Sequence, residues 1–193
     1  MNNNPNSEKA SAQCGKDPES LLSGRSLIIV SNRGPVSFIT AADGSVQTER
    51  SGGGLVTALL GLAQSHNITW IASALDDYEK QWGKRRISLD DEGKSINLLL
   101  VPLESDVYDG YYNVISNPLL WFLQHSMWDF ITAPTITEET WQAWDNGYVV
   151  ANRLFAQATA QHIKSSSQKS LVMVQDYHLY LMPRMLLGML RRT

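Results

Sequence analysis

An arginine and a glycine triplet are the first residues in this chain whose types and spacing suggest chemistry. Arg33 stands in SNRG, residues 31–34, directly after an apolar run, and residues 52–54 are three glycines in front of another apolar run. Glycines that open a helix let backbone N–H groups approach an anion, and the helix dipole favours negative charge there. An arginine at an adjacent strand end adds bidentate phosphate recognition. The pair therefore favours a phosphate or diphosphate ligand, while the glycines alone fit a tight turn equally well.

The glycine spacing disfavours two common nucleotide sites. The triplet does not match G-x-G-x-x-G, and no G-K-[ST] follows it. A typical dinucleotide site and a P-loop both need those spacings to bring the backbone against the phosphates.

Two further segments carry polar side chains at informative places. In QDYH, residues 175–178, Asp176 follows an apolar run and is expected either to accept hydrogen bonds from substrate hydroxyls or to cap the following helix. Two potential ligands in this segment do not define a metal site. Residues 109–130 mix aromatic rings with amide side chains, which suits sugar recognition but also fits an aromatic core cluster.

The elements that must position these residues follow from the hydrophobic pattern. Apolar runs predict buried strands, and longer stretches of helical period predict helices. The predicted strands are residues 26–32, 68–73, 96–101 and 170–175, and the predicted helices are residues 54–65, 141–163 and a segment after Gln175 with Pro183 in its first turns. Strands that alternate with helices indicate an α/β fold with a Rossmann-like parallel sheet and flanking helices.

The topology of such a sheet brings the polar segments together. Ligands of open parallel sheets bind at the carboxyl ends of the strands, where SNRG and QDYH both lie. Residues 34–51 are expected to form the loop that leaves the first strand, and the basic cluster of residues 84–86 is expected to form a solvated loop.

The composition is that of a globular protein. The 193 residues are 43% hydrophobic and 18% charged with a net charge of −3, which argues against disorder and against general nucleic-acid affinity. The single cysteine, Cys14, excludes an internal disulfide. No apolar run approaches the ~20 residues of a membrane span, and the N-terminus lacks a signal-peptide core, so a cytoplasmic protein is expected. Polar residues 1–24 are expected to form a disordered tail before one domain, residues 25–193.

Five segments together resemble the trehalose-6-phosphate synthase family of retaining glucosyltransferases. They occur in the family's order and span about residues 27–187: VSNRGPV, GGGLVTAL, YYNVISNPLLWFLQH, WDNGYVVANRLFA and VQDYHLYLMPRML. Two places depart from the family pattern: WIAS at residues 70–73, where the family often has WxGW, and Gln175, where many members have histidine.

The resemblance implies a GT-B architecture, in which two Rossmann-like domains face each other across a cleft. This chain would be most of the N-terminal, acceptor-side domain, without the C-terminal donor-binding domain, and is therefore expected to be inactive alone. The family transfers glucose from a nucleotide sugar, usually UDP-glucose, to glucose 6-phosphate with retention and without a metal or other cofactor. The expected partners are a nucleotide-sugar donor and a sugar-phosphate acceptor, a nucleic-acid or membrane partner is not expected, and a homo-oligomer stays open.

The family motifs also assign site residues. By resemblance, Arg33 binds the acceptor phosphate together with Tyr112 and Trp121. Gly53 and Gly54 lie against the donor diphosphate, and Asp176 is the catalytic-site residue that holds acceptor or donor-sugar hydroxyls. The alternatives are another phosphorylated acceptor such as glycerol 3-phosphate, a non-catalytic sugar-phosphate-binding module and, disfavoured by the glycine spacing, a nicotinamide-dependent oxidoreductase.

Overall fold

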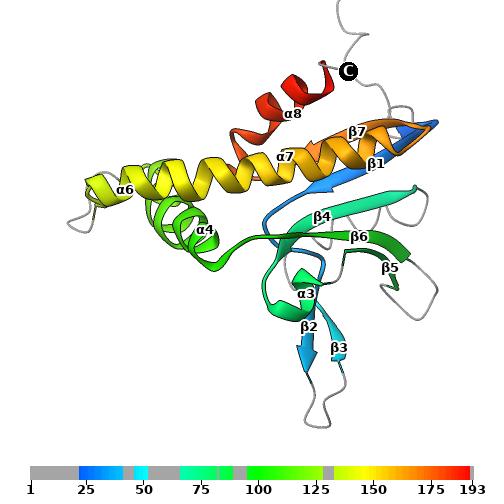
Figure 1. The fold of residues 1–193 in the computed structure, drawn as a ribbon, viewed down its shortest axis with the longest axis horizontal. Coiled ribbons are helices and arrows are strands. Elements are labelled where there is room, and N and C mark those ends of the chain that lie inside the picture. The colour runs from blue at the N-terminus through cyan, green and yellow to red at the C-terminus, as the bar shows by residue number, and fades with distance from the viewer. Residues whose placement is uncertain are drawn as a thin grey trace, which may run out of the picture.

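The sheet at the centre of the described part of the fold has five strands. The computed structural model describes residues 22–40, 46–51, 66–81, 83–88, 95–127 and 133–191. Within them the strand order is β5–β6–β4–β1–β7, and the helices α7 and α8 lie along one face of the sheet (Figure 1).

The four predicted strands are confirmed, and they run parallel to one another. They are β1 (Arg25–Val30), β4 (Ile68–Ala74), β6 (Ser95–Pro102) and β7 (Lys169–Val174). β1 pairs with β4 on one side and with β7 on the other. The apolar residues of β1 and all of β4 are buried, as expected for strands that are covered on both faces. The predicted α/β class with a Rossmann-like sheet is therefore confirmed.

Two predicted loops are wrong, because both form strands. The basic cluster belongs to β5 (Lys84–Ser88), which pairs antiparallel with β6 at the edge of the sheet. Its three cationic side chains are exposed and only Ile87 is buried, a charged pattern typical of edge strands. The segment after β1 contains an antiparallel hairpin of β2 (Val36–Thr40) and β3 (Val46–Arg50) that projects from the sheet (Figure 1).

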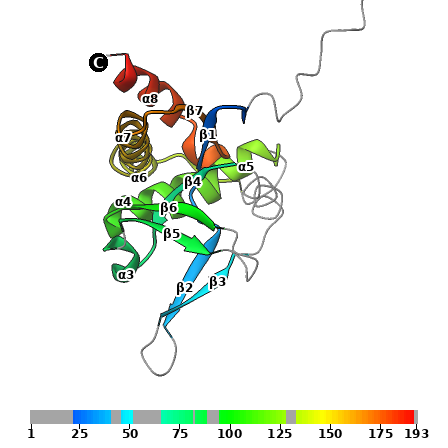
Figure 2. The same cartoon turned by 90° about the vertical axis from the view of Figure 1, so that its right-hand side faces the viewer.

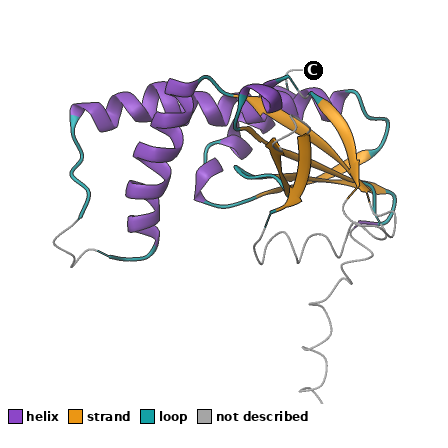
Figure 3. Ribbon diagram, turned by 90° about the horizontal axis from the view of Figure 1, so that it is seen from below, coloured by secondary structure: helices purple, strands orange, loops and turns teal. Residues whose placement is uncertain are grey.

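Two long helical segments supply most of the remaining described structure, and both contain π-helical turns. The first comprises α4 (Ser105–Tyr108), η1 (Asp109–Leu120) and α5 (Trp121–Gln124). The second comprises α6 (Glu138–Ala143), η2 (Trp144–Tyr148) and α7 (Val149–Lys164). Figure 3 shows the first segment crossing the second beside the sheet. Three short elements complete the described fold: α3 (Asp77–Lys80), η3 (Tyr177–Leu179) and α8 (Met182–Leu190).

The two helical segments touch through glycines. A Cβ atom built on Gly147 would lie 2.7 Å from the carbonyl carbon of Gly110 and 2.7 Å from the amide nitrogen of Tyr111. Real Cβ atoms essentially never come so close to another heavy atom, so only glycine fits at position 147. This backbone contact fixes how η1, which carries Tyr112, lies against η2 and α7.

The helix predicted for residues 141–163 is confirmed, and Thr137 caps its start by accepting a hydrogen bond from the Thr140 amide. Tyr148 and Phe155 are buried on its sheet-facing side, whereas Trp141 is exposed. The helix predicted for residues 54–65 lies outside the described residues, as do residues 1–21 of the predicted tail. Leu22, the first described residue, is buried in the core.

Candidate functional site

Arg33 lies in a turn that the neighbouring strand β4 holds in place. The Ser31 amide donates a hydrogen bond to the Ile71 carbonyl at 3.1 Å, directly after the end of β1. The buried Trp70 indole donates to the Ser31 hydroxyl at 2.7 Å, and that hydroxyl donates to the Arg33 carbonyl at 2.6 Å. A buried indole N–H needs an acceptor, so Trp70 stabilises this arrangement. The backbone of Arg33 is fixed while its side chain stays exposed.

Asn32 anchors the same turn to the end of β4. The Ser73 hydroxyl donates to the Asn32 side-chain oxygen at 2.9 Å, and the Ser73 amide donates to the Asn32 carbonyl at 3.1 Å. Trp70 and Ser73 are the first and last residues of WIAS, the segment that departs from the family pattern. In this chain that segment therefore supports the Arg33 turn.

The structure brings Arg33 and Tyr112 together. The guanidinium carbon of Arg33 lies 5.7 Å from the centre of the Tyr112 ring, a distance at which a cation and a ring attract each other. Hydrogen bonding by Asn117 lowers the pKa of the Tyr112 phenol from its ordinary value, burial opposes this, and hydrogen bonding by Arg33 and its positive charge lower the pKa further. A cation and a phenol hydroxyl next to each other form a suitable site for an anionic group.

A buried carboxyl group that the sequence did not single out also lies near this arginine. Glu79 is 5% exposed and accepts a hydrogen bond from the Leu75 amide at 2.5 Å. Burial raises the pKa of Glu79, while the charge of Arg33 acts in the opposite direction. The only signal for Glu79 in the sequence is its position shortly after a predicted strand.

A row of aromatic rings connects Tyr112 to the segment after β7. The ring centres are 5.3 Å apart between Tyr108 and Tyr112, 5.7 Å between Tyr112 and His178, and 4.3 Å between His178 and Tyr177, with interplanar angles of 24°, 14° and 24°. The rings come from α4, η1 and η3. The aromatic patch of residues 109–130 is thus divided, because Tyr111 and Phe122 are buried in the core whereas Tyr112 faces this site.

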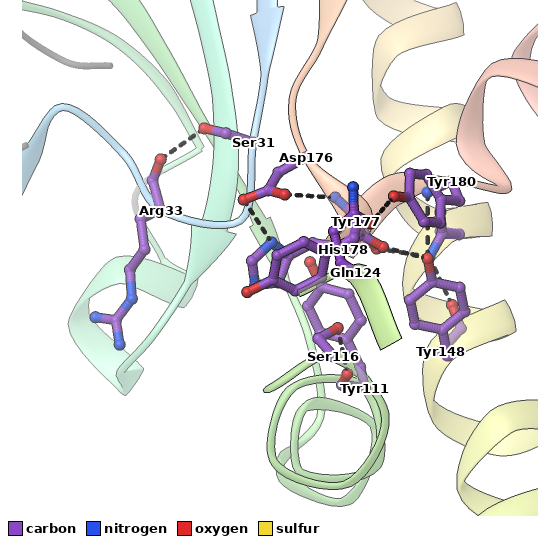
Figure 4. Close-up of polar contacts among 11 residues, drawn as sticks. Ser31, Arg33, Tyr111, Ser116, Gln124, Tyr148, Asp176, Tyr177, His178 and Tyr180 are labelled. Carbon is purple, nitrogen blue, oxygen red and sulfur yellow. Dashed lines mark hydrogen bonds and ion pairs between the residues drawn. The ribbon is translucent and has the colours of Figure 1, made fainter. Parts of the chain in front are cut away.

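Asp176 lies at the carboxyl end of β7, next to the end of β1 that carries Arg33. Its side chain is 53% exposed, and it both caps η3, by accepting from the Tyr177 amide at 2.7 Å, and approaches His178 Nδ1 at 3.6 Å (Figure 4). Burial lowers the pKa of His178, Asp176 raises it, and Arg33 lowers it further. A mostly neutral imidazole beside an exposed carboxylate leaves that carboxylate available as a hydrogen-bond acceptor.

The remaining predicted site residues are Trp121, Gly53 and Gly54. Trp121 is 41% exposed on α5 and packs against His125, with ring centres 4.4 Å apart, so its role in the site stays a prediction. Gly53 and Gly54 lie outside the described residues. In the described ranges no three His, Cys, Asp or Glu side chains are grouped so that they could hold a metal ion. None of the helices in these ranges combines the length and apolar character that a membrane crossing requires.

Two further residues beside the site were not predicted from the sequence. Tyr148 and Asn152 lie one helical turn apart on the buried side of η2 and α7, and both contact the segment that follows Asp176. A polar Asn on the apolar side of a helix was the available signal, because a buried amide needs partners.

The described geometry combines an exposed guanidinium, a phenol and an exposed carboxylate at the carboxyl ends of the parallel strands. The guanidinium is suited to a phosphate, and the carboxylate is suited to hydroxyl groups. A ligand that carries both, such as a sugar phosphate, matches this set of side chains.

Known proteins are similar to this chain in sequence and in fold. Residues 25–192 match the family described as Glycosyltransferase family 20. A trehalose-6-phosphate synthase of Mycolicibacterium vanbaalenii is 35% identical over 177 residues, which are 88% of this chain and 32% of that protein. An alpha,alpha-trehalose-phosphate synthase [UDP-forming] of Emericella nidulans is 35% identical over 161 residues, which are 83% of this chain and 29% of that protein. The chain thus spans about a third of the length of these relatives.

Solved structures agree in fold. A structure described as trehalose-6-phosphate from E. coli bound with UDP-2-fluoro glucose has a TM-score of 0.58 at 20% identity and covers 84% of this chain and 30% of its own. An alpha,alpha-trehalose 6-phosphate synthase from Burkholderia multivorans has a TM-score of 0.57 at 23% identity, with 85% and 30% covered. The family match covers nearly all described residues and includes Arg33, Tyr112 and Asp176. The chain therefore belongs to glycosyltransferase family 20, the family of the trehalose-6-phosphate synthases.

Proposed function

We propose that the native protein that contains this chain transfers glucose from UDP-glucose to glucose 6-phosphate. The product is trehalose 6-phosphate, and the anomeric configuration of the transferred glucose is retained. One observation carries this proposal: Arg33, Tyr112 and Asp176, which come from three distant parts of the sequence, lie together around the carboxyl ends of β1 and β7. The names of the relatives support the reaction, and the UDP-2-fluoro glucose of the E. coli structure supports the donor.

In this proposal the chain supplies the acceptor side of the site. Arg33 binds the phosphate of glucose 6-phosphate as a charge-assisted pair, and the Tyr112 hydroxyl adds a hydrogen bond. Asp176 accepts hydrogen bonds from sugar hydroxyls and so orients the acceptor. Gly53 and Gly54 approach the donor diphosphate, and Trp121 contacts the acceptor.

The reaction needs orientation more than a protein nucleophile. In a front-face transfer the leaving diphosphate takes the proton of the attacking hydroxyl, so the protein has to hold donor and acceptor and stabilise the developing charge. Of the two described carboxyl groups near the acceptor, only Asp176 is exposed while Glu79 is buried, which is consistent with that requirement.

The test is a transfer assay on the native polypeptide. UDP-glucose is supplied with glucose 6-phosphate or with glycerol 3-phosphate, released UDP is measured, and the product and its anomeric configuration are determined by NMR. We expect trehalose 6-phosphate from glucose 6-phosphate. A product with glycerol 3-phosphate and none with glucose 6-phosphate would reject glucose 6-phosphate as the acceptor.

A variant of Arg33 separates a transferase from a binding module. Arg33→Ala is expected to raise the KM for glucose 6-phosphate and to leave the KM for UDP-glucose unchanged, with Arg153→Ala on α7 as a control in which a different arginine is lost. Binding of glucose 6-phosphate without any transfer by the wild-type polypeptide would reject the enzyme and favour a non-catalytic sugar-phosphate-binding module.

A further inference from the structure

The segment after Asp176 is held from one side by the Tyr148 hydroxyl. That hydroxyl donates a hydrogen bond to the Tyr177 carbonyl at 2.5 Å and accepts one from the Tyr180 amide at 3.2 Å (Figure 4). Burial raises the pKa of Tyr148 to about 12, so the phenol keeps its proton and remains a donor near neutral pH. One side chain of η2 therefore fixes the backbone on both sides of His178.

Asn152 holds the same segment one helical turn further on. Its amide nitrogen donates to the His178 carbonyl at 3.1 Å and to the Tyr148 carbonyl at 2.9 Å. Its oxygen accepts from the Leu181 amide at 3.2 Å and from the Met182 amide at 3.0 Å. The side chain is fully buried, and both its donor and its acceptor are used. The amide thus ties α7 to the start of α8.

Asp176 needs such support because its backbone is strained. It has φ 70° and ψ 170°, a region that is essentially restricted to glycine. A residue stays there only when its surroundings over-determine it. On the preceding side, the Gln175 amide donates to the Val30 carbonyl at 2.8 Å and continues the pairing of β7 with β1. On the following side, the hydrogen bonds of Tyr148 and Asn152 hold the chain.

We propose that Tyr148 and Asn152 are positioning residues that keep Asp176 in this conformation and so direct its carboxylate toward the hydroxyls of the acceptor. This inference rests on the proposed function for its substrate. Neither side chain has to touch the acceptor, since both act through the backbone of residues 177–182.

The chain offers a matched control for the Tyr148 hydroxyl. Tyr111 is also fully buried, and its ring centre lies 6.0 Å from that of Tyr148. Its hydroxyl has no hydrogen-bond partner among the described residues. Tyr148→Phe and Tyr111→Phe therefore remove the same atom from neighbouring buried rings, but only the first removes bonds to the segment after Asp176.

The experiment measures steady-state kinetics of the native polypeptide with UDP-glucose and glucose 6-phosphate. We expect Tyr148→Phe to raise the KM for glucose 6-phosphate about tenfold, which corresponds to ~1.4 kcal/mol, and to leave the KM for UDP-glucose within twofold. Tyr111→Phe is expected to change neither. In an Asp176→Asn background, Tyr148→Phe is expected to have little further effect, because the two residues act as one unit.

Equal KM values for glucose 6-phosphate in the two Phe variants would overturn the inference, as would a full effect of Tyr148→Phe in the Asp176→Asn background. If Tyr148→Phe does not fold, Asn152→Ser replaces it with the same expected and opposing results. A wild-type polypeptide without transferase activity would instead reject the proposed function.

Crystal structures of the two Phe variants test the inference without any substrate. Asp176 is expected to leave the positive-φ region in Tyr148→Phe and to keep it in Tyr111→Phe. A positive φ at Asp176 in both variants would reject the positioning role, whatever the polypeptide transfers.

Discussion

Replacement of Gly147 by alanine tests the contact between the two helical segments. The new Cβ would lie 2.7 Å from backbone atoms of Gly110 and Tyr111, whereas ordinary contacts begin at 3.4 Å. The helices would have to separate by about 0.7 Å, the difference between these distances, in an interior that has little free space. Backbone atoms cannot rotate away as a side chain can, so the separation involves the whole helix.

The expected magnitude follows from two opposing effects. Overpacking typically lowers the free energy of unfolding by about 1–3 kcal/mol. Because the new Cβ would meet backbone atoms, which cannot rotate away, we take a cost of ~3 kcal/mol for this site. Alanine gains about 1 kcal/mol over glycine in a helix. We therefore expect Gly147→Ala to lower the free energy of unfolding by about 2 kcal/mol, and the melting temperature by roughly 4–8 °C for a domain of this size.

The assay is urea-induced unfolding of the 193-residue chain, followed by circular dichroism, with Gly188→Ala as the control. Gly188 is also helical, but no atom of the described residues lies within 4 Å of the position that a Cβ would take there, so alanine is expected to stabilise by up to about 1 kcal/mol. A Gly147→Ala chain that is as stable as the wild type would refute the tight crossing of η1 and η2.

Three further predictions concern the site itself. Both Asp176→Gly and Asp176→Ala remove the carboxylate, but the glycine variant should be more stable by about 1 kcal/mol or more in urea unfolding, since only glycine tolerates φ 70° and ψ 170° without strain; equal stabilities would contradict the strained backbone. Because the pKa of His178 is lowered in the folded chain, the unfolded chain binds a proton more readily. The free energy of unfolding should therefore fall as the pH drops below about 6.5, the ordinary pKa of histidine, toward the pKa in the folded chain. His178→Gln should make that loss smaller when unfolding is measured at pH 7.5 and at pH 5.5. Arg33→Ala should raise the pKa of the Tyr112 phenol, measured by ultraviolet-difference titration with Tyr112→Phe as the reference. An unchanged pKa would show that Arg33 does not interact with the Tyr112 phenol.

The central sheet could be predicted because its chemistry is uniform. β1 and β4 are buried on both faces, so their sequences are short, mainly apolar runs with β-branched residues, which are typical of buried strands. β5 could not be predicted in the same way, since an edge strand with exposed Lys84, Arg85 and Arg86 has the composition of a loop. The hairpin of β2 and β3 was missed for a related reason, because it lies outside the central sheet and Ile39, Thr48 and Glu49 are exposed.

The site was predicted only in part, because a sequence shows side chains and not their neighbours. Arg33 and Asp176 were found because parallel strands end at one edge of a sheet, a rule that needs no side-chain geometry. The roles of Tyr148 and Asn152 depend on hydrogen bonds to a backbone about 30 residues away along the chain, which no local pattern shows. Gly147 could not be interpreted from the sequence either, since the contact that requires it lies across a helix crossing.

The sheet and the helices determine different distances within the site. Arg33 and Asp176 follow β1 and β7, which are hydrogen-bonded neighbours about 4.8 Å apart, so pairing in the sheet sets the spacing of the two strand ends. Tyr112 reaches the same place from η1, whose position depends on the glycine contact with η2 rather than on strand pairing. Figure 2 shows the helical segment from α4 to α5, which contains η1. A change in the packing of η1 can therefore move Tyr112 relative to Arg33 and leave the spacing of the two strand ends intact. In the proposed site, the fit to anionic ligands of different size can thus change through the helices without any change in the sheet.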